Sequence, residues 1–128
     1  MNITKLAIRA SLILLFLTMT SVFVQAQQDD IKQYKIAFFT EKLELTETEA
    51  ESFWPVYNEY EKEKKELRVK FNDDDGPDAK VEQMEAEMTL LKEYNAKFKE
   101  VLSDNKVGKL HKAEKEFKEI LIKMLQNR

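Results

Sequence analysis

The chain has 128 residues and a formal net charge of −3 at pH 7, with 35% charged and 43% hydrophobic residues. The absence of cysteine excludes a disulfide scaffold and a lipidated N-terminal cysteine, and an acidic chain lacks the basic stripe typical of nucleic-acid binding. Only two glycines and two prolines occur, which argues against the many turns of a multi-stranded sheet. We therefore predict an all-α fold with four helices.

The N-terminal segment has the features of a secretory signal peptide. A basic region with Lys5 and Arg9 precedes an apolar run, and the run ends at the small-residue cleavage pattern Val24-Gln25-Ala26. The run is shorter than the roughly 20 residues needed to span a bilayer. We expect cleavage of residues 1–26 and export to the periplasm as a single domain, residues 27–128, without a membrane span. An uncleaved membrane anchor is the alternative.

Cleavage would make the chain more acidic. Loss of Lys5 and Arg9 lowers the number of basic residues from 21 to 19 against 24 acidic residues, which gives a net charge of −5.

The first helix of the mature chain is expected from about Asp30 to Leu43. Its apolar residues cover more than one stripe, so we expect it to nest between other helices: Ile31, Tyr34, Ile36, Phe38, Phe39 and Leu43.

A capping box opens the second helix. Thr46 is followed three residues later by Glu49, so hydroxyl and carboxylate can each accept an unpaired backbone N–H, and Leu45 can act as a hydrophobic staple. The helix should run from about Glu47 to Phe71, with Pro55 bending its axis. The residues expected on its buried face are Ala50, Phe53, Trp54, Tyr57, Leu67 and Phe71.

Residues 72–78 form the one obvious loop. Four residues match the spacing of an EF-hand calcium loop: Asp73, Asp75, Gly76 and Glu82. However, Phe71 occupies the first ligand position, where it cannot coordinate a metal. A turn in which Asp78 caps the next helix explains the same residues.

The third helix carries an unbroken heptad seam of the kind found in a coiled coil. Its members are Val81, Met84, Met88, Leu91, Asn95, Phe98 and Leu102. We expect this seam to be buried, with Asn95 fixing the register. Met84 and Met88 are interpreted as adaptable core rather than as soft-metal ligands.

The start of the fourth helix repeats that of the second, because Leu102 and Ser103 follow Leu45 and Thr46 by 57 residues. An internal repeat and the independent use of similar capping residues both explain the match. The helix should reach about Gln126, and its expected inward residues are Val107, Leu110, Phe117, Ile120, Leu121 and Met124. Helices two to four would each be roughly 35 Å long, forming elongated helical hairpins whose seams one chain can hardly cover, so we expect a homodimer.

Little catalytic chemistry is available. The sequence offers no glycine-rich phosphate loop and no convincing Ser-His-acid or Cys-His set, so we expect neither an enzyme nor a cofactor. His111 and Glu114 lie one helical turn apart and are the best candidates for metal ligands. A metal site needs three or four ligands, so a surface histidine is the preferred interpretation.

These motifs resemble those of the Spy/CpxP-like periplasmic proteins, whose hallmark is a Leu-Thr-x-x-Gln motif. Leu45-Thr46-x-x-Glu49 opens one helix and Leu102-Ser103 opens another. In addition, the segment Phe53-Trp54-Pro55-Val56-Tyr57 is similar to that of the small exported proteins known as sensors of ECF-type sigma factors.

The resemblance implies a bent, cradle-shaped, antiparallel helical dimer. Such proteins hold unfolded clients without ATP, as chaperones, or report envelope stress to a regulator. Glu49 departs from the motif's Gln, although it can cap equally well. The acidic charge of the mature chain differs from the basic concave surface of the chaperone members, and metal-sensing relatives use several histidines where this chain has only His111.

The first hypothesis is therefore a regulatory protein that takes part in the envelope stress response by binding a protein partner through a helical face. A chaperone of the holdase type and a metal-binding sensor are the alternatives. Phe38, Phe39 and Trp54 are the candidate apolar contacts for a partner or client, although a place in the core is the preferred interpretation.

Overall fold

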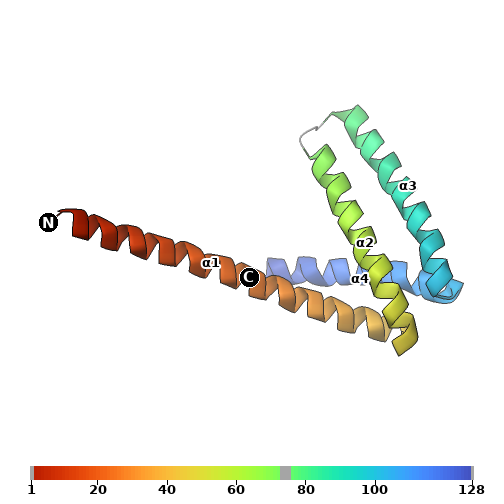
Figure 1. Ribbon diagram of the computed structural model, residues 1–128. Helices are drawn as coiled ribbons and strands as arrows, with labels where there is room; N and C mark the ends of the chain where they lie inside the picture. The colour runs from red at the N-terminus through yellow and green to blue at the C-terminus, as the bar shows by residue number, and fades with distance from the viewer. Residues whose placement is uncertain (1, 73–75, 128) are drawn as a thin grey trace. The chain divides into compact units, whose positions relative to one another are not determined.

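The computed structural model consists of helices and short connections, which confirms the predicted all-α class (Figure 1). It describes the backbone of residues 2–72 and 76–127, and their side chains apart from those of residues 2, 6 and 9–26. The described range contains no strand, and its four helices are α1 (Asn2–Leu43), α2 (Glu47–Phe71), α3 (Pro77–Val101) and α4 (Asp104–Gln126). The chain divides into two compact units, residues 1–37 and 38–128.

Helix α1 is much longer than predicted. It begins at Asn2 instead of Asp30, because no glycine or proline interrupts the sequence between the expected signal segment and the first predicted helix. Among the side chains of α1 that the structure describes, the fully buried ones lie at the C-terminal end: Phe39 and Leu43 are fully buried, whereas Ile31 and Tyr34 are each 42% exposed. Within the described part of the chain, no helix combines the length and apolar character that crossing a bilayer requires.

Helix α2 begins with the predicted capping box. The Glu49 N–H donates to Thr46 Oγ1 at 3.2 Å, and the Thr46 N–H donates to Glu49 Oε2 at 3.0 Å. The helix continues past Pro55 to Phe71; the bend expected at this proline stays a prediction. Leu45, which precedes the cap, is partly buried against the core.

Helix α3 does not begin as predicted. Its N-cap is Gly76, which makes no side-chain cap hydrogen bond, and Pro77 occupies the first turn, where its missing N–H costs nothing. Asp78 therefore lies inside the first turn instead of capping it, and there its charge suits the helix dipole. Asp73 and Asp75 of the calcium hypothesis lie outside the described residues.

Aromatic side chains from all four helices form the core of residues 38–128. The ring centroids of Phe39 and Tyr57 are 5.3 Å apart, and those of Tyr60 and Tyr94 are 5.2 Å apart. Such pairs contribute roughly 0.5–1.5 kcal/mol each beyond the area they bury. The buried cluster comprises Phe39, Leu43, Phe53, Tyr57, Tyr60, Leu90, Tyr94, Phe98, Leu102, Val107, Leu110, Ala113 and Phe117.

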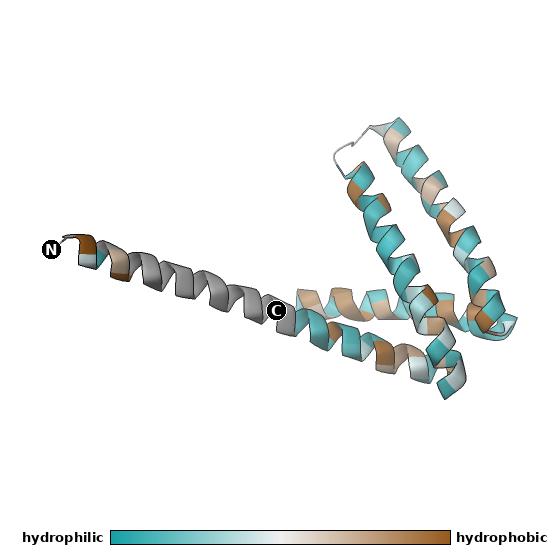
Figure 2. Ribbon diagram, viewed as in Figure 1, coloured by the Kyte–Doolittle hydropathy of each residue, from teal (hydrophilic) through white to brown (hydrophobic). Residues whose placement is uncertain are grey.

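Burial follows the predicted faces near the centre of this unit and departs from them at the ends. Leu67 and Phe71 of α2 are only partly buried, and Figure 2 shows the second half of α2 as mostly hydrophilic. In α4, Met124 is 46% exposed instead of inward, while Ala113, which was not predicted, is buried.

Helices α2 and α3 run antiparallel and pack against each other, and α4 packs against α3 (Figure 1).

Candidate interaction surface

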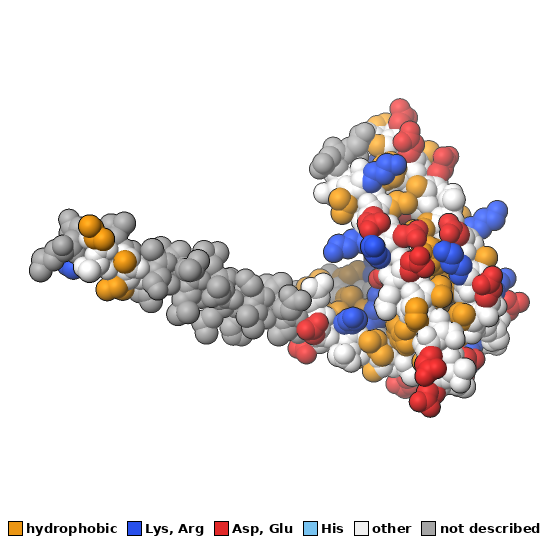
Figure 3. Space-filling view, in the orientation of Figure 1, with side chains coloured by type: hydrophobic (Ala, Val, Ile, Leu, Met, Phe, Trp, Pro, Cys, Tyr) orange, Lys and Arg blue, Asp and Glu red, His pale blue; other side chains and the backbone are white. Residues whose placement is uncertain are grey.

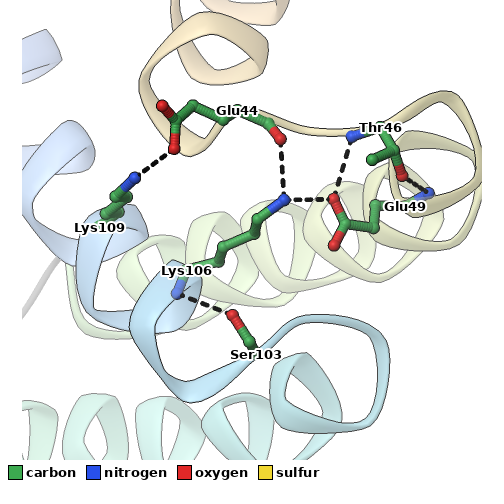
Figure 4. Close-up of polar contacts among 6 residues, drawn as sticks. All are labelled: Glu44, Thr46, Glu49, Ser103, Lys106 and Lys109. Atoms are coloured by element: carbon green, nitrogen blue, oxygen red, sulfur yellow. Dashed lines mark hydrogen bonds and ion pairs between the residues drawn. The ribbon is translucent and has the colours of Figure 1, made fainter.

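The beginnings of α2 and α4 meet at one polar junction (Figure 4). Lys106 Nζ donates to the backbone carbonyl oxygen of Glu44 at 2.8 Å and forms an ion pair with Glu49 Oε2. Glu44 is the one non-glycine residue described with a positive φ, 52°, and its carboxylate pairs with Lys109. Lys106 and Lys109 of α4 therefore both bind Glu44, the residue that follows α1. Lys106 also binds Glu49, whose carboxylate caps α2.

The same contacts bear on the possible internal repeat. Glu49 and Lys106 occupy equivalent positions 57 residues apart and touch each other. Tyr57 and Glu114 are also equivalent, and the Tyr57 hydroxyl donates to Glu114 Oε1 at 3.4 Å. Equivalent residues thus contact each other across α2 and α4, an arrangement that an internal repeat and two independent caps both explain.

The candidate metal ligands take part in a hydrogen-bond network between helices. His111 Nε2 lies 2.8 Å from Asn95 Oδ1 of α3, and His111 Nδ1 lies 3.4 Å from Glu114 Oε2. Burial raises the pKa of Tyr57 well above its usual value, so this hydroxyl keeps its proton and donates to Glu114. The described residues contain no group of three or more His, Cys, Asp or Glu side chains placed to hold a metal ion.

Asn95, the polar member of the seam, links α3 to α4. It is half-buried and contacts His111 of α4, so its place in the seam serves the α3–α4 contact within one chain.

The N-terminal half of the predicted seam in α3 is exposed, which contradicts its interpretation as core. Val81 is 55% exposed, and Met84 and Met88 are each 67% exposed. The C-terminal seam residues Phe98 and Leu102 are buried as predicted, and the other buried residues of helix α3 lie beside the seam: Ala79, Leu90 and Tyr94. We refer to Val81, Met84 and Met88 as the α3 face.

A groove between α2 and α3 borders this face. Its volume is about 270 Å³, and its lining residues are Tyr60, Lys64, Met84, Glu87, Met88, Leu90 and Leu91. The charged groups at its margin have partners: Lys64 Nζ lies 3.1 Å from Glu61 Oε1, and Glu87 Oε1 accepts from Gln83 Nε2 at 3.1 Å. The groove therefore offers mainly apolar surface and thioether sulfur.

A second, shallower groove lies on the outer side of the same face, where Met84 and Met88 also take part with Val81, Glu85 and Thr89. Figure 3 shows hydrophobic groups lying between acidic and basic side chains on the visible surface. Charged side chains line the grooves beside the apolar ones: Lys64 and Glu87 in the first groove, and Glu85 in the second. Such a patch marks a contact surface more often than a scattered apolar residue does.

The candidate contact residues named from the sequence lie elsewhere. Phe39 is completely buried, and Phe38 and Trp54 are partly buried against the core. The ring centroids of Phe38 and Phe117 are 5.8 Å apart, and those of Phe39 and Trp54 are 6.2 Å apart. These three side chains serve the packing of residues 38–128.

Sequence reasoning missed Met84 and Met88 as surface residues, although one signal was present. Helix α3 has further apolar residues beside the heptad seam, Leu90 and Tyr94, which continue to the seam residue Phe98. A helix that packs against one hairpin partner can bury one stripe and leave the other open.

No family model, curated protein or solved structure matches this chain.

Proposed function

We propose that the chain is an exported, non-enzymatic interaction protein of the periplasm. It binds an apolar helical segment of an envelope partner at the α3 face and the adjoining groove, and it regulates that partner in ECF-type sigma factor signalling. The observation that carries the proposal is the exposure of Met84 and Met88, 67% each, beside an apolar groove. The sequence resemblance supplies the link to envelope stress.

The size of the surface suits a peptide-like ligand. Full burial of a methionine or valine side chain contributes about 1.5–3 kcal/mol, so three such side chains can support a specific contact. An amphipathic helix laid in a groove uses anchors spaced three and four residues apart, and Val81, Met84 and Met88 have that spacing. Methionine adapts to partners of different shape because its side chain is flexible and polarizable.

Capture of the partner from envelope extract by the tagged mature chain tests this proposal. Wild type and the control Val69→Glu, which alters a valine of α2 that is 67% exposed and does not line the groove, should recover the same protein. Met84→Glu/Met88→Glu should lose it, because the carboxylates place charge in the contact. Equal recovery by all three chains would show that the partner binds elsewhere.

An ATP-independent holdase is the second candidate function. Exposed apolar side chains also occur on α2 and α4, where Val69 is 67% and Leu125 is 68% exposed, and such dispersed surface suits unfolded clients. Suppression of client aggregation at stoichiometric amounts, lost in Met84→Glu/Met88→Glu, would favour this function. Inactivity in that assay, together with a specific captured partner, would favour the regulatory one.

We also propose, from the family resemblance, that the mature chain is a homodimer. The last turns of α4 support this proposal, because Ile122, Met124 and Leu125 are 44%, 46% and 68% exposed. Light scattering at tens of micromolar should then give twice the mass of the mature chain. A monomer under those conditions contradicts the proposal.

Metal sensing, the remaining alternative, draws only on His111 and Glu114. Both nitrogens of His111 lie near other side chains of the network. Calorimetric titration of the mature chain with zinc, copper and calcium should give no binding heat, and heat that disappears in His111→Ala would restore this alternative.

A further inference from the structure

We propose that Met84 and Met88 form an oxidation site. Hydrogen peroxide or a hypohalous acid converts both thioethers to sulfoxides there, and this change weakens binding at the α3 face. The consequence for binding rests on the function proposed above, whereas the oxidation does not.

Methionine is the only sulfur-containing residue type in this sequence, because it has no cysteine. Met84 and Met88 are each 67% exposed, compared with 46% for Met124. The single tryptophan, Trp54, is partly buried against the core. Oxidants in solution therefore reach the two sulfur atoms of the α3 face more readily than that of Met124.

The two methionines are also placed so that oxidation changes one continuous surface. They are one helical turn apart on α3, and both contribute to the groove with Tyr60 and Leu91 as well as to the outer groove with Val81. A sulfoxide is polar and strongly hydrated, so it opposes the burial of the side chain that carries it. Two sulfoxides therefore turn an apolar contact into a polar one.

The reaction balances with the oxidant alone. The thioether sulfur attacks one peroxide oxygen, the O–O bond breaks, and a sulfur–oxygen bond forms. Sulfur loses two electrons, and the leaving oxygen takes up the proton of the transferred oxygen and departs as water. With hypochlorous acid the O–Cl bond breaks instead, and chloride and a proton are released.

Oxidation at this site should leave the fold unchanged. The α3 stripe that packs in the core consists of other residues, among them Leu90, Tyr94 and Phe98. The site thus differs from a core methionine, whose oxidation disrupts packing. Methionine sulfoxide reductase can restore the thioether, so the change is reversible.

The first experiment locates the oxidation without a partner. The purified mature chain is treated with hydrogen peroxide, and peptide mass spectrometry follows each methionine with time. Met84 and Met88 should each gain one oxygen faster than Met124, while the far-ultraviolet circular dichroism stays constant. Faster oxidation of Met124, or loss of helix as Met84 and Met88 react, would overturn the proposed site.

The second experiment measures the consequence with Nile red, a neutral apolar dye, as the probe. Oxidation of the wild type should lower dye fluorescence by about threefold or more, because the apolar surface becomes hydrated. Met84→Leu/Met88→Leu keeps the apolar volume without the sulfur, so its fluorescence should survive the same treatment. Reductase treatment should restore the wild-type signal.

Two results separate the two proposals. Oxidised wild type that binds the dye as well as reduced wild type would overturn the switch but not the proposed function. Reduced wild type that binds no dye would count against the groove as an apolar binding surface, and the mass spectra would still decide on the oxidation site. Once a partner is captured, its affinity should fall by about tenfold for each methionine oxidised.

Discussion

Lys106 connects three helices through a single ammonium group. It approaches the carbonyl of Glu44 at the end of α1 and the capping carboxylate of Glu49 in α2, while its own backbone N–H donates to Ser103 Oγ at 3.4 Å. Its side chain is 20% exposed, which reduces screening by solvent. Lys106, whose backbone N–H is capped at the start of α4, therefore also binds the residue that caps the start of α2.

The two caps should differ in strength. Thr46→Ala removes the acceptor for the Glu49 N–H and should lower the free energy of unfolding by about 1 kcal/mol. Ser103→Ala should cost less, because the Ser103 cap has a longer hydrogen bond, 3.4 Å, and its third residue is a lysine that cannot complete a capping box. Urea unfolding of both variants, with Thr46→Ser as the control, checks the order, and an equal or larger loss for Ser103→Ala contradicts it.

Acid should weaken the Lys106 junction. The hydrogen bond from Lys106 holds the pKa of Glu49 below its usual 4.5, and the hydrogen bond from Lys109 lowers the pKa of Glu44 in the same way. A carboxyl whose pKa is lower in the folded state stabilises the fold above the unfolded pKa, and this stability is lost as the pH falls through the folded pKa. The loss should therefore occur below about pH 4.5.

Lys106→Met isolates this effect. The variant should be less stable than wild type at neutral pH, and the difference should shrink below the pKa of Glu49, where the carboxyl is protonated in both chains. Urea unfolding of the two chains at a series of pH values, from neutral to acidic, measures it. A difference that stays constant over the whole series would mean that Lys106 acts through packing and not through its charge.

Helix starts could be predicted from the sequence because capping is a local property. Thr46 and Glu49, and likewise Ser103, satisfy N–H groups within one turn of themselves. The start of α3 was predicted wrongly, with Asp78 as the cap. The helix begins at Pro77, so Gly76 is the N-cap and Asp78 lies in the first turn. The all-α class followed from the scarcity of glycine and proline.

The contact surface could not be predicted in the same way, because periodicity identifies an apolar stripe but not its partner. The stripe through Met84 and Met88 and the stripe through Leu90 and Tyr94 are both consistent with a helix face. Only the position of α2 decides which stripe is covered. The binding of Asn95 to His111 likewise depends on how α3 and α4 meet.

Stability should distinguish the two stripes of α3. Leu90→Ala removes a side chain that is 8% exposed in the core and should lower the free energy of unfolding by about 2–4 kcal/mol. Met88→Ala, at 67% exposure, should change it by less than about 0.5 kcal/mol. Urea unfolding of each variant, at a protein concentration low enough to keep the chain monomeric, tests both predictions. A large loss of unfolding free energy for Met88→Ala would show that this residue is covered in solution.

At the scale of the whole molecule, the buried cluster that the structure describes is built from residues after the expected signal segment. Every residue of this cluster lies between Phe39 and Phe117, with partly buried neighbours from Phe38 to Leu121. We therefore expect cleavage after Ala26 to leave this cluster complete, although helix α1 extends as far as Asn2.

Export of the full chain tests this arrangement. The protein expressed from Met1 in a bacterial host should be recovered from the periplasmic fraction with Gln27 as its first residue, because the apolar run is too short to hold a bilayer stably. N-terminal sequencing and intact mass decide the point, and a chain truncated by design to residues 27–128 should have the same urea midpoint as the exported product. A chain that keeps residues 1–26 and sediments with membranes would instead identify an anchor, and the α3 face would then act at the membrane surface.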